Sequence, residues 1–251
     1  MKIIFYCHQN DLKFIKEYLY PLVSFLNAEL IIFEKDVVLL DSDYHIFIQK
    51  IPHGFSGKNI ILFNIEQLSR KDFKLECSPK TIVLDYAIGN LNFIKNEKYC
   101  IPYLYNPKEI YHLPKTKDVC FIGGTSPRRE KMLNEVRKLG IPIDKIKLWG
   151  KRRDKVLFQY KILLNIGYAE DYQIFETIRC NRCIYNQMIV ISDYKLDMKK
   201  IPLKEHLIFV EDKLYPQMVK FVLNHYQEVF HKLKLNEIKI DTPNIPQFLL
   251  K

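Results

Sequence analysis

The chain has 251 residues, of which 48% are hydrophobic and 27% are charged, and its formal net charge is +10. This is enough sequence to bury a core in one large domain or two small ones, and the low Gly and Pro content argues against a low-complexity chain. No stretch reaches the apolar length of a membrane span, and the short apolar run after Met1 is typical of a first strand and not of a signal peptide. We therefore expect a cytoplasmic protein with no integral membrane segment, whose six cysteines are reduced thiols.

The first hundred residues combine short apolar runs with one amphipathic segment. Strands are predicted at 2–6, 29–33, 59–63 and 81–84, with shorter apolar runs at 37–40 and 45–48. Residues 11–27 are predicted to be helical because Leu12, Ile15, Leu19, Leu22, Val23 and Leu26 recur at helical spacing, and Asn10 or Asp11 can cap this helix. A second helix is predicted to start within 65–73. Residues 1–105 are therefore predicted to form a compact α/β domain, a reduced Rossmann-like unit.

A Pro-bearing stretch at 106–116 is predicted to link this domain to a second one at 117–235. Strands predicted at 119–122, 145–149, 162–166 and 188–192 alternate there with helices that begin near Pro127 and cover 151–160 and 174–185. This alternation predicts a parallel sheet with helices on both faces, so the fold class is α/β with two Rossmann-like domains. An edge strand at 207–210, a long helix at 216–233 and an extended tail at 236–251 complete the chain.

The turn between the strand at 119–122 and the helix that begins near Pro127 has the composition of an anion site. The sequence GGTS at 123–126 ends a strand and opens a helix, so free backbone N–H groups and the positive end of the helix dipole meet there. Arg128 and Arg129 follow at once, although acidic residues are the usual choice in a first helical turn. Because the pattern matches neither standard phosphate loop, a plain strand–helix turn with solvated arginines stays the alternative.

Two further patterns have a structural alternative that we favour. Asp41 and Asp43 form an Asp-x-Asp that suits a divalent metal, but the same triplet also suits a polar turn. Cys180 and Cys183 form a C-x2-C without a second pair or a nearby histidine, which indicates core packing, since zinc needs four ligands. No metal site is predicted.

Several longer segments resemble one enzyme family. DVCFIGGTSPRREKML, KLWGKRRDKVLFQYKILLNIGY and IFETIRCNRCIYNQMIVISD, all within 118–193, resemble the C-terminal half of a GT-B glycosyltransferase. The likeness is to the group-1-like transferases of bacteria and large DNA viruses, which show the same Ser-Pro-Arg-Arg turn, Trp-Gly element and IFExxR helix. ILFNIEQL at 61–68 and VLDYAIGN at 83–90 resemble elements of their N-terminal half. The sequence departs from the wider fold's paired glutamates, because Arg182 stands near the second position, so the ribose ligand is unassigned.

The resemblance implies a metal-independent transferase that moves a sugar from a UDP-, GDP- or dTDP-sugar to a glycan or another hydroxyl acceptor, with no cofactor. The donor-binding residues would be Gly123, Gly124, Thr125, Ser126, Arg128, Arg129, Trp149, Lys151, Glu176 and Arg179. Arg128 would also be catalytic by stabilising the leaving diphosphate, and Asp85 or Glu66 would be the general base of an inverting reaction. Asn64, Gln67 and His8 would lie on the acceptor side. The alternatives are structural: Glu66 would support the start of a helix, Asp85 would cap a turn, and His8 would have a purely structural role.

Other functions fit the basic composition as well. A non-catalytic module that binds nucleotide sugars or polyanions, including nucleic acids, is the main alternative. The basic residues are spread along the chain, and no recognised nucleic-acid-binding motif occurs, so no nucleic-acid partner is predicted.

Overall fold

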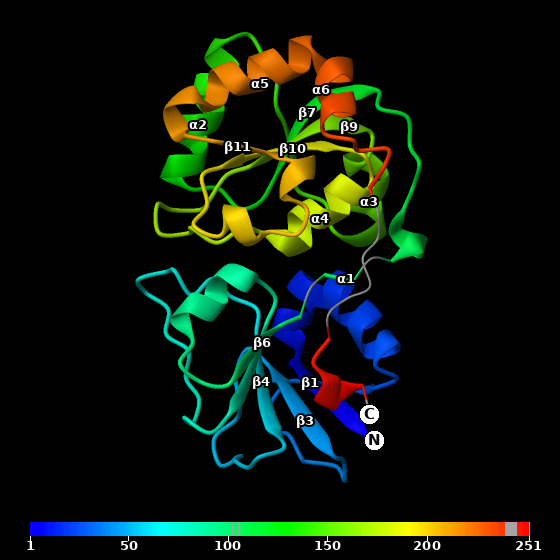
Figure 1. The fold of residues 1–251 in the computed structure, drawn as a ribbon, viewed down its shortest axis with the longest axis vertical. Coiled ribbons are helices and arrows are strands. Elements are labelled where there is room, and N and C mark those ends of the chain that lie inside the picture. Colours follow the sequence, from blue (N-terminus) through cyan, green and yellow to red (C-terminus); the bar gives the residue numbers. More distant parts are fainter. Residues whose placement is uncertain (102, 105, 239–244, 251) are drawn as a thin grey trace. The chain divides into compact units, whose positions relative to one another are not determined.

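The computed structural model describes residues 1–101, 103–104, 106–238 and 245–250 (Figure 1). The chain divides into two compact units, Met1–Leu104 together with the C-terminal end, and Tyr105–Asp241. Each unit is built around its own parallel sheet. The predicted α/β class with two Rossmann-like sheets is therefore confirmed.

Within the described residues, the first unit has a six-stranded parallel sheet in the order β2-β1-β3-β4-β5-β6. Its strands are β1 (Ile3–His8), β2 (Glu29–Phe33), β3 (Tyr44–Ile48), β4 (Ile60–Asn64), β5 (Ile82–Asp85) and β6 (Lys98–Cys100). The central strands are almost continuously apolar because both faces of the sheet are buried. The helix α1 (Gln9–Phe25) buries Ile15, Tyr18, Leu19 and Leu22, and it is the only α-helix in the described part of this unit.

One prediction for the first unit is wrong. Residues 65–73 form turns instead of a helix, because the side chains of Asn64 and Asn90 bond the backbone there: both donate to the Glu66 carbonyl, and Asn90 accepts from the Leu68 amide. Of the two shorter apolar runs, 45–48 belongs to β3, and 37–40 lies outside any helix or strand. The first helix also begins two residues early, because the His8 Nδ1 caps it by accepting from the Asn10 amide at 3.2 Å.

The second unit has a five-stranded parallel sheet in the order β11-β10-β9-β7-β8, counting described residues alone. Its strands are β7 (Lys117–Ile122), β8 (Asp144–Ile146), β9 (Tyr160–Asn165), β10 (Ile189–Asp193) and β11 (Ile208–Val210). Its α-helices are α2 (Pro127–Lys138), α3 (Gly150–Leu157), α4 (Thr177–Tyr185), α5 (Tyr215–Asn224) and α6 (Tyr226–Lys232). The chain runs outward from β7 to β8 on one side and from β9 to β11 on the other, so the topological switch point lies between β7 and β9.

The predicted long helix at 216–233 is interrupted at His225. Its φ of −116° and ψ of 33° leave the helical region, and its ring stacks on Phe221 with 4.6 Å between centroids. The predicted strand at 145–149 ends at Ile146. Of the predicted tail, residues 239–244 and 251 lie outside the described residues. The described end belongs to the first unit, where Phe248 packs against Tyr44 and Tyr99.

The stretch that was predicted as a linker packs closely on the second unit. Arg182 of α4 is buried and forms ion pairs with Glu109 at 2.9 Å and Asp154 at 2.8 Å. The Asn186 side chain accepts from the Tyr111 amide at 2.9 Å. Arg182 therefore fastens the residues after 105 to this unit, which explains why an arginine stands near the expected second glutamate.

Candidate functional site

The turn that follows β7 is tied to the loop that follows β9 at the switch point. Ser126 caps α2 by accepting from the Arg129 amide at 3.2 Å, and its hydroxyl donates to the Tyr168 carbonyl at 2.6 Å. Gly123 has a φ of +145°, and a Cβ there would stand 3.1 Å from the Arg129 Nη1. Glycine is therefore required at 123, both for the backbone conformation and for the close approach of the guanidinium.

Arg129 is a buried cation at this turn. Its Nε donates to the Ile166 carbonyl at 2.8 Å and its Nη1 donates to the Gly124 carbonyl at 3.0 Å. The guanidinium also lies over the ring of Tyr168, 5.3 Å from its centroid. Burial, together with the nearby charge of Arg179, lowers the pKa of Arg129 to about 10. Two neighbouring guanidinium groups, one of them buried, are typical of a site that binds an anion.

Arg179 is the more accessible of these two arginines. It lies on α4, and its Nη1 donates to the Asn165 side chain at 3.2 Å, at the carboxyl end of β9. Its Nη2 stands 3.9 Å from the Glu176 carboxylate, which is a long separation for an ion pair. With 22% of its side chain exposed, Arg179 is only loosely held. Arg129, Arg179 and Glu176 together leave one positive charge at the switch point.

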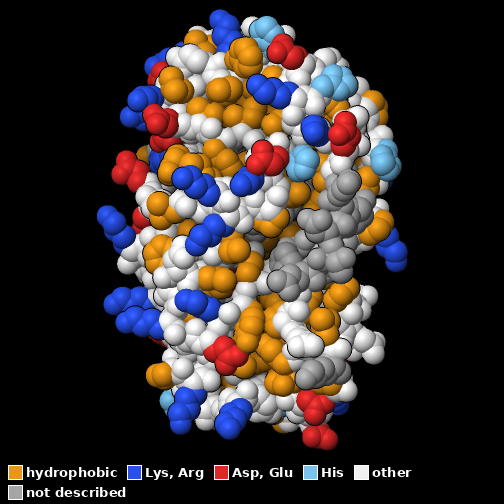
Figure 2. Space-filling model, in the orientation of Figure 1, with side chains coloured by type: hydrophobic (Ala, Val, Ile, Leu, Met, Phe, Trp, Pro, Cys, Tyr) orange, Lys and Arg blue, Asp and Glu red, His pale blue; other side chains and the backbone are white. Residues whose placement is uncertain are grey.

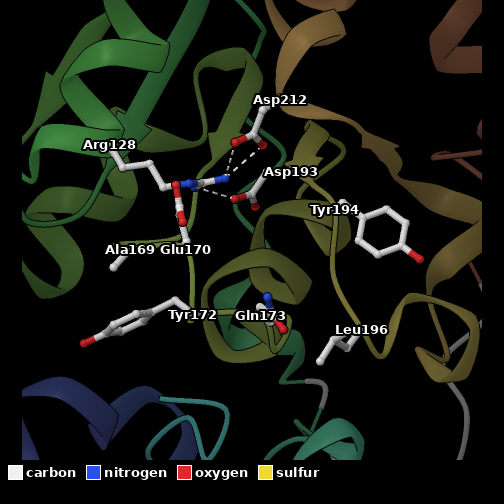
Figure 3. A pocket seen from close by; sticks show the side chains of 9 residues that line it. All are labelled: Arg128, Ala169, Glu170, Tyr172, Gln173, Asp193, Tyr194, Leu196 and Asp212. Atoms are coloured by element: carbon white, nitrogen blue, oxygen red, sulfur yellow. Dashed lines mark hydrogen bonds and ion pairs between the residues drawn. The ribbon is translucent and has the colours of Figure 1, made fainter. Parts of the chain in front are cut away.

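Arg128 has a different environment from the one that its predicted role requires (Figure 3). Its Nη1 donates to Asp193 at 2.7 Å and to the Gly167 carbonyl at 3.1 Å, and its Nη2 donates to both carboxylate oxygens of Asp212 at 2.7 and 2.8 Å. Asp193 is itself paired with the buried Lys195 at 2.8 Å. Two cations and two carboxylates therefore form a neutral cluster. The role of Arg128 as a diphosphate ligand stays a prediction, and a phosphate would have to displace Asp212 to reach it.

Two of the predicted donor-binding residues, Trp149 and Lys151, follow the edge strand β8, which pairs with β7. Trp149 occupies the residue position just before α3 and is 58% exposed, and Lys151 is also exposed in the first turn of that helix. An exposed indole next to a cation is suited to stacking on a nucleobase.

In the first unit, Asp85 is the centre of a buried hydrogen-bond network. It accepts from the side chains of Asn64 at 2.6 Å and Asn90 at 2.9 Å, and from the Ala87 amide at 2.8 Å. Burial raises the pKa of Asp85 to about 7, although these donors favour the ionised form. Asp85 is 0% exposed, so in this conformation no substrate can reach it. Its geometry is that of a residue that holds the turn after β4, and Asn90 is a member of this network that sequence reasoning missed.

The other acceptor-side candidates differ in accessibility. Glu66 is 36% exposed and pairs with Arg70 at 2.9 Å. Gln67 is buried. His8 is engaged at both ring nitrogens: its Nδ1 caps α1, and its Nε2 lies 3.0 Å from the Glu34 carbonyl. The contacts of His8 therefore match its structural alternative. Of Asp85 and Glu66, the two carboxylates that were predicted as the general base, Glu66 is the accessible one.

The sequence patterns that were weighed as metal sites have other contacts. Asp43 accepts from the Lys2 amide at 2.6 Å, and Cys180 and Cys183 are fully buried in the core of the second unit. Across the described part of the chain, no three His, Cys, Asp or Glu side chains are grouped so that they could hold a metal ion. In the same residues, every helix is too short or too polar to cross a membrane. On the face shown in Figure 2, the Lys and Arg side chains are scattered among acidic ones.

Three comparisons place the chain among known proteins. No protein-family model matches it. The uncharacterized protein L140 of Acanthamoeba polyphaga mimivirus is 30% identical over 241 residues, which cover 85% of this chain and 78% of L140. A solved α1,3-fucosyltransferase matches 96% of this chain and 82% of its own with a TM-score of 0.53 and 11% identity, and its complex with GDP matches with a TM-score of 0.52. At this identity the likeness shows the fold alone, which is the predicted GT-B type.

Proposed function

The chain belongs to the same family as the mimivirus protein L140, and we propose that it is a glycosyltransferase that moves a sugar from a nucleotide-diphosphate donor to a hydroxyl acceptor. The fold agrees with this proposal, since it is shared with an α1,3-fucosyltransferase that is described in complex with GDP and with GDP-fucose. The six cysteines are free thiols, which fits a reducing compartment such as a host cytoplasm.

One observation carries the proposal: Arg129 and Arg179 converge with the Gly-Gly turn at the switch point of the second sheet. The carboxyl ends of parallel strands at a switch point are where ligands of α/β folds bind. Among the described residues, the amides of Gly124 and Thr125 have no hydrogen-bond acceptor, and they precede the positive end of α2. A diphosphate there would neutralise the excess charge and accept from those amides.

The chemistry of transfer follows from this placement. When the bond to the donor sugar breaks, negative charge grows on the leaving diphosphate, and fixed cations and N–H groups stabilise it without reorganisation. We assign this role to Arg179 and to the amides of the turn, with Arg129 as the buried charge behind them. Glu176 stands beside Arg179 and would accept hydrogen bonds from sugar or ribose hydroxyls. In an inverting reaction Glu66 would take the proton of the acceptor hydroxyl, with Asp85 fixing the turn that carries it.

The first test is a thermal-shift and turnover screen against UDP-, GDP- and dTDP-sugars. A ligand that binds only the folded chain at a hundred times its Kd adds about 2.7 kcal/mol to the free energy of unfolding. We expect one nucleotide class to raise the Tm and to be hydrolysed or transferred slowly, with release of the nucleoside diphosphate. A chain that binds a nucleotide sugar but turns over with no acceptor would be a binding module. The proposal would be contradicted if the chain bound none of the nucleotide sugars and instead bound DNA or RNA with an affinity that falls steeply with salt.

The variant Gly124→Ala sharpens this test. A Cβ at Gly124 would meet nothing closer than the Tyr168 ring at 4.0 Å, so the variant should fold normally. The added methyl group would stand where the backbone approaches a diphosphate, so nucleotide binding should weaken while the Tm without ligand stays that of the wild type. Unchanged binding by this variant would count against the turn as the phosphate site.

A further inference from the structure

A cavity of about 290 Å³ opens at the carboxyl ends of β9 and β10, beside the switch point (Figure 3). Three loops and the start of α2 form it. The lining residues are Arg128, Ala169, Glu170, Tyr172, Gln173, Asp193, Tyr194, Leu196 and Asp212. The proposed diphosphate site uses none of these side chains, so the cavity is a separate feature of the second unit.

The polar wall of this cavity does not attract an anion. Arg128 is balanced by Asp193 and Asp212, and Lys195 supplies the second positive charge behind Asp193. Glu170 adds a carboxylate that forms no ion pair within the described residues. The wall therefore has a net charge of −1, and it offers acceptor oxygens to a ligand that carries hydroxyl groups.

The opposite wall is apolar and open. Tyr194 and Leu196 are 54% and 57% exposed, and Figure 3 shows them on the side of the cavity away from Arg128. Tyr172 adds a second aromatic ring, which lies on the other side of the view, below Arg128 and Ala169. An aromatic face opposite carboxylate and amide groups suits a pyranose, whose C–H face is apolar and whose edge carries hydroxyls.

We infer that this cavity binds one neutral monosaccharide unit. Its volume lies just below the range for small-molecule pockets, roughly 300 to 1,000 Å³, which fits one sugar ring and not a whole nucleotide sugar. This inference rests on the proposed function. In a glycosyltransferase the bound monosaccharide would be either the donor sugar that is transferred or the sugar unit of the acceptor.

The test is saturation-transfer NMR on the full chain with methyl glycosides of glucose, galactose, mannose and fucose, and with N-acetylglucosamine. We expect at least one to bind with about millimolar affinity, and Tyr194→Ala and Glu170→Gln each to weaken it about tenfold. Phe221→Ala is the matched control, because Phe221 is an aromatic residue of α5 that is 48% exposed and lies outside the cavity. All three variants should keep the wild-type Tm.

The origin of the sugar is tested by competition. If an intact nucleotide sugar displaces the glycoside and its nucleoside diphosphate alone does not, the cavity holds the sugar that is transferred; if neither displaces it, the cavity holds the acceptor. The inference is overturned if no glycoside binds, or if Tyr194→Ala binds as well as Phe221→Ala. Nucleotide binding is measured in parallel on the same samples, so a chain that binds nucleotides but no glycoside refutes the cavity's role alone.

Discussion

Replacing Arg179 by alanine should weaken the binding of nucleoside diphosphates by about 30-fold and leave the fold intact. In the structure this guanidinium makes one 3.2 Å hydrogen bond to Asn165 and one 3.9 Å contact to Glu176, so its removal costs little stability. A hydrogen bond between charged groups contributes about 1.5–3 kcal/mol. Because the side chain is 22% exposed, we take about 2 kcal/mol, which corresponds to the expected change in Kd.

The assay is calorimetric titration of UDP and GDP into wild type, Arg179→Ala and the control Arg137→Ala. Arg137 lies in the last turn of the same unit's α2 and bonds only its neighbour Asn134 among the described residues, so its removal takes away an equal charge at the opposite end of the helix. Arg137→Ala should bind like wild type. Equal affinities for the two variants would show that binding depends on net charge alone and would refute the assignment of Arg179.

Three other changes test the fold around the site. Gly167→Ala should lower the free energy of unfolding in urea by about 1–3 kcal/mol, because its Cβ would stand 2.9 Å from the Tyr172 carbonyl; a wild-type midpoint would contradict the tight loop. Asp154→Ala should cost about 1.5–3 kcal/mol in the same assay, since the buried Arg182 loses one of its two carboxylate partners and keeps Glu109; a loss under about 1 kcal/mol would mean that the ion pair with Asp154 contributes little. The raised pKa of Asp85 means that the folded chain keeps a proton which the unfolded chain releases from about pH 4 upward, so stability should fall by up to about 4 kcal/mol between pH 4 and 7. Asp85→Asn should abolish that fall, and a pH dependence identical to wild type would place the titrating group elsewhere.

The strands and the start of α2 were readable from the sequence because their signals are local. Continuous apolar runs predicted the buried parallel strands, and the Gly-Gly turn with Ser126 predicted where α2 begins. The break at His225 was not readable, since the apolar face continues across it. The turn at 65–70 was missed because its backbone is bonded by the side chain of Asn90, which is more than twenty residues away in the sequence.

The charges of the site were the least predictable part. Arg128 and Arg129 are adjacent, and the sequence favoured Arg128 for the catalytic role, but their side chains leave α2 toward different partners. Arg129 meets backbone carbonyls, and Arg128 meets Asp193 and Asp212. Asp212 is 84 residues from Arg128, and no local sequence pattern predicts that the two residues form an ion pair. The sequence alone therefore does not tell which arginine can bind a ligand, because the partners of each arginine are brought together only in the folded sheet.

A crystal structure of the chain with a bound nucleoside diphosphate would show whether the turn after β7 holds the phosphates. We expect the diphosphate oxygens to lie within about 3 Å of the Arg179 guanidinium and of the amides of Gly124 and Thr125. Arg128 should keep its pairing with Asp193 in that structure. A nucleotide bound elsewhere on the chain, or one whose phosphates contact neither the turn nor Arg179, would contradict this expectation.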